Sequence, residues 1–386
     1  TITNYIRENL RGRIVIIAGL FAKDRSSYLS EIVLNETLAQ CVELEYNHAI
    51  YLNYLNYENN KHIIENITLQ GFVEAPFYFN NNKVYIVDMS KPITLSQDLE
   101  TLLKPPFDIN KSILSIIDKT RNRLKRAISN LYPGELVLVF NRDMIYSKLI
   151  QIICDINNVP IVQGKNRLLG PNMCVPFGAI LNGRILPNTV TKTMHTEKIF
   201  NPDIKDFTIG ASPNYLSLDN QAKMLASFNR PIILVDDLLH KGYRLNVIEP
   251  ILRNNNIKIK KLVVGILTGR GKEIGQTKNI DVDTAYFVPN LKLWFNESAQ
   301  YPFIGGDAVL REEQNQDYII PSINLILPYV SPGFIKNTSI KNIYEFSQVC
   351  LINTIEIFKE IQKVYQEIHG RSLIIRNLGQ ILISPR

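Results

Sequence analysis

The sequence lacks any uncharged apolar run of about 18 residues, which is the length a helix needs to cross a bilayer. Its first twenty residues, TITNYIRENLRGRIVIIAGL, contain no signal-peptide cleavage pattern. They also begin without methionine, as a piece of a longer protein would. These absences predict a cytoplasmic protein that does not bind a membrane.

Cysteine is scarce, and no two of the four cysteines form a CxxC pair. Three of them have apolar neighbours, so the spacing predicts isolated buried thiols and not zinc ligands or a disulfide framework. A reducing cytoplasm agrees with this usage. The four residues are Cys41, Cys154, Cys174 and Cys350.

The sequence also lacks a strong excess of charge of one sign. Charged residues make up 20% of the 386 and hydrophobic residues 45%, which is ordinary for a globular protein, and the net charge of +7 is spread thinly. Such an excess suits an anionic small ligand about as well as nucleic acid. The basic segment 111–131 has no aromatic residues among its charges, which predicts a solvated helix face and no specific nucleic-acid surface. Basic residues on the polar side of this segment are Arg121, Arg123, Lys125 and Arg126.

The first hundred residues alternate between strand and helix patterns and predict a small α/β domain over residues 1–105. Two prolines in LKPPFD (103–108) mark its end. The expected strands are 13–20, 47–55 and 83–90, and the expected helices are 28–43 and 60–70.

Short, continuous apolar runs follow from residue 135, and they are typical of parallel strands buried on both faces. They predict a Rossmann-like parallel sheet with helices on both faces within residues 106–335. A helix at 341–369 has an apolar face that indicates a core contact or a homodimer seam, and it lies in a helical extension over 336–386. The expected strands are 135–140, 232–235 and 261–267, and the expected helices are 144–157 and 244–254.

The stretch RPIILVDDLLHKGYRL (230–245) places two carboxylates, Asp236 and Asp237, at the end of a buried strand. Ligands bind beyond the carboxyl ends of such strands, and two adjacent charges need partners such as vicinal hydroxyls or Mg²⁺. Gly242 permits a tight turn, and the helix after it presents an N-terminus that attracts an anion. The two carboxylates can accept hydrogen bonds from sugar hydroxyls, and the turn can bind a phosphate. A ribose 5-phosphate carries both of these groups.

This stretch resembles the PRPP-binding loop of type I phosphoribosyltransferases, in which four hydrophobic residues precede two acids, two hydrophobic residues and a glycine-containing turn. Asp236, Asp237 and Gly242 match the motif, whereas His240 and Lys241 replace small residues, and Arg244 stands where threonine is common. The resemblance implies a phosphoribosyltransferase-like (PRTase-like) fold. It also implies that the acid pair contacts the ribose hydroxyls and, with Mg²⁺, serves catalysis, while the turn binds phosphate. The implied phosphate-binding residues are His240, Lys241, Gly242, Tyr243 and Arg244.

The resemblance implies three further elements. A pyrophosphate loop is expected after the first core strand, at FNRDMIYS (140–147), where Arg142 is the candidate ligand although glycine is missing. A closing loop is expected within 186–200, with Lys192 and His195 neutralising the leaving pyrophosphate; a solvated hairpin is the alternative. In YPFIGGD (301–307), Tyr301 and Phe303 are candidates for stacking on the acceptor base, and a turn with core aromatics is the alternative.

Residues 13–90 also resemble part of a GNAT-type acetyltransferase, through Asn60 and the later Gly71-Phe72 between two strands. The acetyl-CoA loop would fall at AKDRSSYLSEI (22–32), which contains no glycine, and Ile67 occupies the position of the usual acid tyrosine. A degenerate module or a small lid or dimerisation domain are the alternatives.

Three functions are therefore open. The first is a glycosyltransferase of the phosphoribosyltransferase type that binds PRPP with Mg²⁺ and transfers phosphoribosyl to a nitrogenous base. The second is a non-catalytic PRPP or nucleotide binder, and the third is a degenerate acetyltransferase fragment with a scaffold role.

Overall fold

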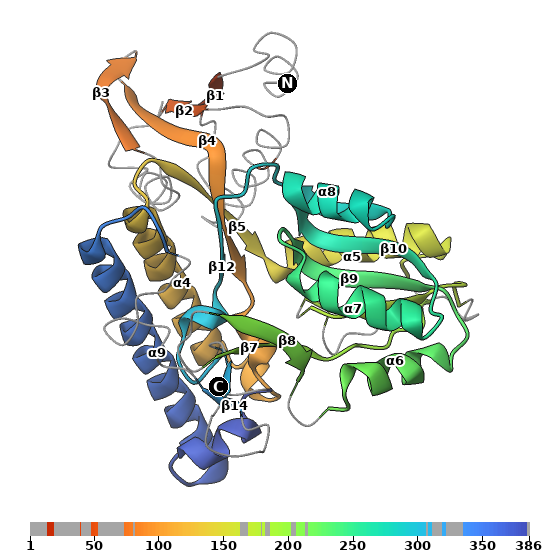
Figure 1. The fold of residues 1–386 in the computed structure, drawn as a ribbon. Helices are drawn as coiled ribbons and strands as arrows, with labels where there is room; N and C mark the ends of the chain where they lie inside the picture. The colour runs from red at the N-terminus through yellow and green to blue at the C-terminus, as the bar shows by residue number, and fades with distance from the viewer. Residues whose placement is uncertain are drawn as a thin grey trace. The chain divides into compact units, whose positions relative to one another are not determined.

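The computed structural model describes most of the chain after residue 82. The described residues are 14–18, 39, 48–52, 73–79, 82–162, 169–178, 180–181, 186–201, 206–212, 215–305, 308–310, 319–321 and 335–383. The chain divides into two compact units (Figure 1). Unit 1 comprises Thr1–Phe140, Asn290–Asp307 and Pro321–Arg386, and unit 2 comprises Asn141–Pro289 and Ala308–Ile320.

Unit 2 is built on a four-stranded parallel sheet in the order β11-β10-β9-β6. The centres of its inner strands are continuous apolar runs, Ile232–Val235 in one and Leu262–Leu267 in the other, as expected of parallel strands covered on both faces. The strands are β6 (Met173–Pro176), β9 (Ile232–Leu239), β10 (Ile259–Leu267) and β11 (Val282–Phe287).

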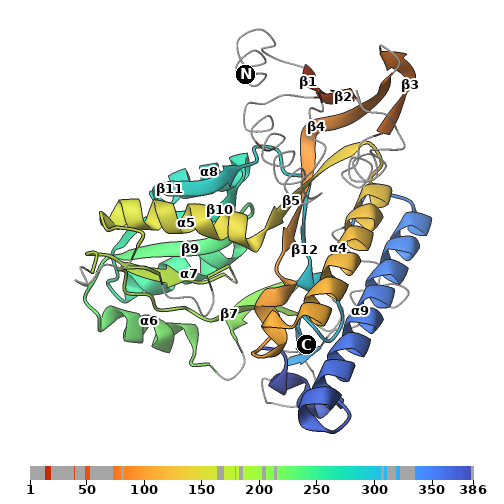
Figure 2. The ribbon, with the colours of Figure 1, turned by 180° about the vertical axis from the view of Figure 1, so that it is seen from behind.

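Helices cover both faces of this sheet (Figures 1 and 2). α6 (Leu218–Ala226) and α7 (Tyr243–Asn254) pack their apolar sides on alternate residues of β6, β9 and β10. α5 (Arg142–Asn157) packs against β10 and β11. There its Ile145 lies close to the backbone of Gly265. α8 (Gly269–Thr277) follows β10, and Thr268 caps it by accepting from the Gly271 amide.

A second, smaller sheet of unit 2 has the order β14-β13-β7-β8. At one side of this sheet is an antiparallel pair in which Thr196 faces Ala211 and Phe200 faces Phe207. β13 is parallel to β7. The strands are β7 (Thr196–Phe200), β8 (Phe207–Ala211), β13 (Ala308–Leu310) and β14 (Ile319–Pro321).

Unit 1 contains a six-stranded mixed sheet in which β1, β2, β4 and β12 run in that order, with β3 and β5 also paired to β4. The predicted strands near the N-terminus are present, whereas the helices expected at 28–43 and 60–70 lie outside the described residues. The strands are β1 (Ile14–Ala18), β2 (His48–Leu52), β3 (Val73–Phe79), β4 (Asn82–Gln97), β5 (Glu135–Asn141) and β12 (Leu293–Asn296).

Two long helices, α4 (Lys111–Leu131) and α9 (Ile340–His369), pack side by side in unit 1 (Figures 1 and 2). Asn110 caps α4 by accepting from two amides of its first turn, and Gly370 ends α9 in a left-handed conformation. Part of the apolar face predicted for 341–369 belongs to the core, because Ile361 and Tyr365 join α4 and the sheet in one cluster, whereas Ile355 and Ile368 are exposed. Short 3₁₀ turns at Leu99–Leu102, Phe107–Ile109, Ser298–Gln300 and Ile375–Gln380 complete the unit.

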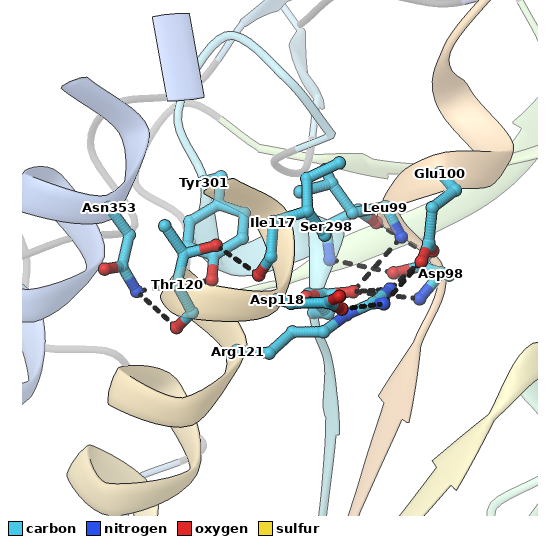
Figure 3. A network of polar contacts seen from close by, with 11 residues as sticks. Asp98, Leu99, Glu100, Ile117, Asp118, Thr120, Arg121, Ser298, Tyr301 and Asn353 are labelled. Carbon is cyan, nitrogen blue, oxygen red and sulfur yellow. Dashed lines mark hydrogen bonds and ion pairs between the residues drawn. The ribbon is translucent and has the colours of Figure 1, made fainter. Parts of the chain in front are cut away.

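The basic face of α4 is not fully solvated, contrary to the expectation from sequence. Arg121 and Lys125 are only 9% and 5% exposed. Arg121 donates to the fully buried Glu297 at 2.9 Å and also to Glu100 (Figure 3). Since the acidic partners lie about 20 and 176 positions away, a helical pattern alone does not reveal them.

The predicted α/β class, with a parallel sheet and helices on both faces, is confirmed by unit 2. The described cysteines Cys154, Cys174 and Cys350 are free and buried, as predicted, and Cys41 lies outside the described residues. In the part of the chain that the structure describes, every helix is too short or too polar to span a bilayer. The division at residues 105 and 335 and the GNAT likeness remain predictions.

Candidate functional site

Asp236 and Asp237 lie at the carboxyl end of β9, an inner strand of the parallel sheet. Their side chains are 7% and 14% exposed. Arg244 lies against both: its Nη1 is 2.9 Å from Asp236 Oδ1 and 3.7 Å from Asp237 Oδ2. The two negative charges are thus compensated by a cation from the second residue of α7. The sequence analysis did not predict this contact, and the phosphate-binding role implied for Arg244 remains a prediction.

Burial dominates the electrostatics of the pair. It raises the pKa of Asp236 to about 6, and the positive charge of Arg244 opposes this shift. The pKa of Arg244 responds in the reverse sense: burial lowers it, but the charges of Asp236, Asp237 and Glu197 raise it above its ordinary value. Glu197, on β7, is itself buried. The site therefore concentrates four ionised or ionisable groups in a region of low solvent access.

The loop that follows β6 also reaches the acid pair. A Cβ atom on Gly178 would lie 2.2 Å from Asp236 Oδ1 and 2.9 Å from Asp237 Oδ2, so only glycine permits this approach. The backbone amide of Ile180 donates to Asp237 Oδ1 at 2.5 Å. β6 is the parallel neighbour of β9, so this loop and the acids lie near the carboxyl ends of two adjacent strands.

The turn after β9 contains a glycine in the left-handed conformation. Gly242 has φ +68° and serves as the N-cap of α7, where no side chain caps the helix. The positive φ favours glycine, and the uncapped helix N-terminus favours an anion. Lys241, which precedes it, is exposed. The turn at Gly242 is therefore suited to an anion, and its binding of a phosphate group remains a prediction.

The side chain of His240 forms a hydrogen bond with Thr268, which lies between β10 and α8. Its Nδ1 is 3.1 Å from Thr268 Oγ1, and Thr268 in turn donates to the carbonyl of Leu239. Burial, aided by the charges of Lys241 and Arg270, lowers the pKa of His240. The hydrogen bond to Thr268 connects this turn to the start of α8, and a role of His240 in binding a phosphate remains a prediction.

The β7–β8 hairpin borders the same site. Thr196 Oγ1 donates to the carbonyl of Phe177 at 2.8 Å, next to Gly178. On β8, Phe207 contacts the edge of Tyr243, the first residue of α7, at a centroid distance of 4.9 Å. The hairpin thus joins the loop after β6 to the beginning of α7.

The two residues proposed for a closing loop have defined contacts. Gln221 accepts from the His195 amide at 2.8 Å and donates to its carbonyl at 3.3 Å. The imidazole of His195 stacks on Tyr215 at 3.6 Å, and burial lowers its pKa. Lys192 has its ammonium 5.5 Å from the centre of the Phe228 ring. Both residues precede β7, and a role in neutralising pyrophosphate remains a prediction.

The aromatic residues proposed for base stacking belong to unit 1. Tyr301 is fully buried in its core, where its hydroxyl accepts from Asn353 (Figure 3), so its ring offers no face to a ligand. The alternative of a core aromatic is correct for this residue. Phe303 is partly buried with φ +63°, and Arg142 is the first residue of α5; their ligand roles remain predictions.

Asp236 and Asp237 are also the candidates for binding Mg²⁺. Among the described residues, no group of three or more His, Cys, Asp or Glu side chains is placed to hold a metal ion. Two carboxylates already engaged with Arg244 and the Ile180 amide do not form a protein-only cage. They fit the other mode of Mg²⁺ binding, in which substrate phosphates supply most of the ligands.

Sequence reasoning missed the loop after β6, Glu197 and Thr268. The sequence signal for the loop was weak because β6 has only four residues and ends in proline, inside a stretch that reads as irregular. The pyrophosphate loop had been expected after residue 140, but β5 pairs with β4 in the other sheet. The described residues after β6 that contact the acid pair are Gly178 and Ile180, and the pyrophosphate role of 140–147 remains a prediction.

Comparisons with known proteins assign no family. No protein-family model matches the sequence, and no curated protein matches it. Among solved structures, the AQ2163 protein from Aquifex aeolicus is similar over 54% of this chain and 89% of its own, with 14% sequence identity and a TM-score of 0.23. A TM-score this low carries no argument about fold or function.

Proposed function

We propose that unit 2 binds PRPP or a related ribose 5-phosphate ester and transfers its phosphoribosyl group to a nitrogenous base. In this proposal Asp236 and Asp237 accept hydrogen bonds from the ribose 2′- and 3′-hydroxyls. The 5′-phosphate lies over the turn at Gly242, and the loop at 177–181 faces the pyrophosphate. Mg²⁺, when bound, supplies charge neutralisation for the phosphates.

The observation that carries the proposal is the meeting of four features near the carboxyl ends of the strands in a parallel sheet. The acid pair, the left-handed glycine that begins α7, the close backbone of Gly178 and the β7–β8 hairpin are joined by direct contacts. Ligands of open α/β sheets bind at these strand ends. Hydroxyl acceptors next to an anion-binding turn suit a sugar phosphate better than a ligand of uniform charge.

The chemistry asked of these residues is mainly positioning and electrostatic stabilisation. The bond from ribose C1 to the pyrophosphate oxygen breaks, and its electron pair leaves with pyrophosphate. A nitrogen of the base donates the pair that forms the new C1–N bond, and the proton lost from the base passes to solvent. No covalent intermediate with the protein is needed.

A second candidate, a non-catalytic PRPP or nucleotide binder, is favoured by one observation. The acid pair is already in contact with Arg244, which a simple hydroxyl-binding site does not require. In a regulatory domain, this ion pair would define the ligand-free state.

Pyrophosphate release separates the two candidates. The protein is incubated with PRPP, Mg²⁺ and a panel of purines, pyrimidines and pyridine carboxylates, and the released pyrophosphate is measured. Release that requires one base supports the enzyme. Thermal stabilisation by PRPP without release for any base supports the binder. Stabilisation by acetyl-CoA and not by PRPP contradicts both and favours the acetyltransferase-like alternative.

A further inference from the structure

Arg244 contacts the two carboxylates that are proposed to bind the ribose hydroxyls. Its Nη1 is 2.9 Å from Asp236 Oδ1, and this carboxylate oxygen also accepts from the Asp237 amide at 2.9 Å. The arginine side chain is 28% exposed, more than the 7% and 14% of the two acids. The two carboxylates are thus less open to solvent than the side chain of Arg244, which contacts both of them.

We infer that Arg244 is the residue that makes this site specific for phosphorylated ribose, because the sugar gains access to the acid pair only when a phosphate takes over the guanidinium. This inference rests on the proposed function and names the selectivity of that site. Unphosphorylated ribose or a nucleoside is excluded by the same residue.

The physical reason is the cost of separating buried charges. Replacing the guanidinium on Asp236 by a neutral hydroxyl takes from Arg244 the carboxylate that lies closest to it, and separating buried charges is strongly unfavourable. A phosphate supplies a new partner of equal or greater charge, and Arg–phosphate contacts are among the strongest hydrogen-bonded pairs. Arg244 then exchanges partners, and the carboxylates exchange a cation for two hydroxyl groups.

The surroundings of Arg244 suit such an exchange. It is the second residue of α7, one position after Tyr243 and two after Gly242, so its backbone lies at the turn proposed for the phosphate. Asp237 keeps the Ile180 amide as a second partner when the guanidinium leaves. Glu197 is the other negative charge that acts on Arg244, and it holds the cation within the site during the exchange.

Calorimetric titration of the wild-type protein tests the inference without any variant. Ribose is titrated in the absence and in the presence of saturating inorganic phosphate. The inference predicts that phosphate tightens ribose binding by about 5- to 150-fold, the range of typical coupling between two sites, and that ribose tightens phosphate binding by the same factor. Ribose affinity that is unchanged or weakened by phosphate overturns it.

A variant pair gives the second test. Arg244→Gln is predicted to reduce the ratio of ribose 5-phosphate affinity to ribose affinity by roughly tenfold or more. Arg253→Gln is the matched control, since Arg253 is also on α7 but pairs with Glu249 at its far end. Its ratio is predicted to equal that of the wild type. Arg244→Lys keeps the cation and is predicted to retain most of the preference.

The outcomes distinguish this inference from the proposed function. If the wild type binds ribose 5-phosphate and the ratio is unchanged in Arg244→Gln, the selectivity role of Arg244 is wrong and the proposed function stands. If the wild type binds neither ribose 5-phosphate nor PRPP, both are wrong. If Arg244→Gln does not fold, as circular dichroism would show, the phosphate-coupled titration of the wild type decides.

Discussion

Substitution of Gly178 by alanine tests the placement of the loop at 177–181. The added Cβ would lie 2.2 Å from Asp236 Oδ1 and 2.9 Å from Asp237 Oδ2, well inside van der Waals contact. Either the loop or the acid pair must move, and the Ile180 amide that donates to Asp237 at 2.5 Å moves with it. Overpacking of this kind typically costs about 1–3 kcal/mol.

The magnitude is measurable by thermal denaturation. For a domain of about 150–250 residues, 1 kcal/mol corresponds to roughly 2–4 °C in Tm, so Gly178→Ala is expected to lower Tm by about 2–12 °C. A calorimetric titration with ribose 5-phosphate is expected to show weaker binding, because the acids that accept the ribose hydroxyls are displaced.

Gly379→Ala is the matched control. No atom lies within 4 Å of a Cβ placed on Gly379, which is in the last 3₁₀ turn of unit 1. Its effect on stability is expected to stay within about 0.5 kcal/mol. A Gly178→Ala protein with the Tm and ligand affinity of the wild type would refute the placement of the loop against the acid pair.

Three further predictions concern buried groups. Because burial raises the pKa of Asp236 from 3.8 to about 6, the folded state binds its proton more tightly than the unfolded state does. The associated stability is fully present below about pH 4 and is lost as the pH rises through about 6; urea unfolding across this window should show the slope in the wild type and not in Asp236→Asn. Arg121→Met leaves Glu297 buried without its guanidinium and is expected to lower the free energy of unfolding by about 3–5 kcal/mol, whereas an unchanged urea midpoint would contradict the network in Figure 3. Tyr301→Phe removes the hydroxyl that accepts from Asn353 and should lower the free energy of unfolding by about 0.5–1.5 kcal/mol, whereas an unchanged urea midpoint would contradict a contribution of this hydrogen bond to stability.

The sequence predicts most of the regular elements because their patterns are local. α4 and α9 begin and end within a residue of the predicted limits, since Asn110, Ser339 and Gly370 are recognisable caps. β9 and β10 were found from continuous apolar runs, although both strands extend beyond the predicted ends. A helical or strand period is visible in ten or twenty residues of sequence.

The site was only partly predictable because its contacts are not local. The acid pair and Gly242 were visible as one motif, but the approach of Gly178 to Asp236 joins positions 58 apart, the difference between 236 and 178. A sequence pattern does not show the direction of a side chain. It therefore does not tell whether Arg244 contacts the two acids or a ligand. For the same reason the burial of Arg121 and Tyr301 became evident only from their distant partners.

Binding of PRPP to the wild type and to the Asp236→Asn/Asp237→Asn double variant tests the central claim most directly. Calorimetric titration in the presence of Mg²⁺ is expected to show one site on the wild-type protein and no measurable heat of binding with a folded double variant. Equal affinity of the two proteins for PRPP, or no binding by the wild type, would contradict the assignment of the acid pair to a ribose-phosphate site.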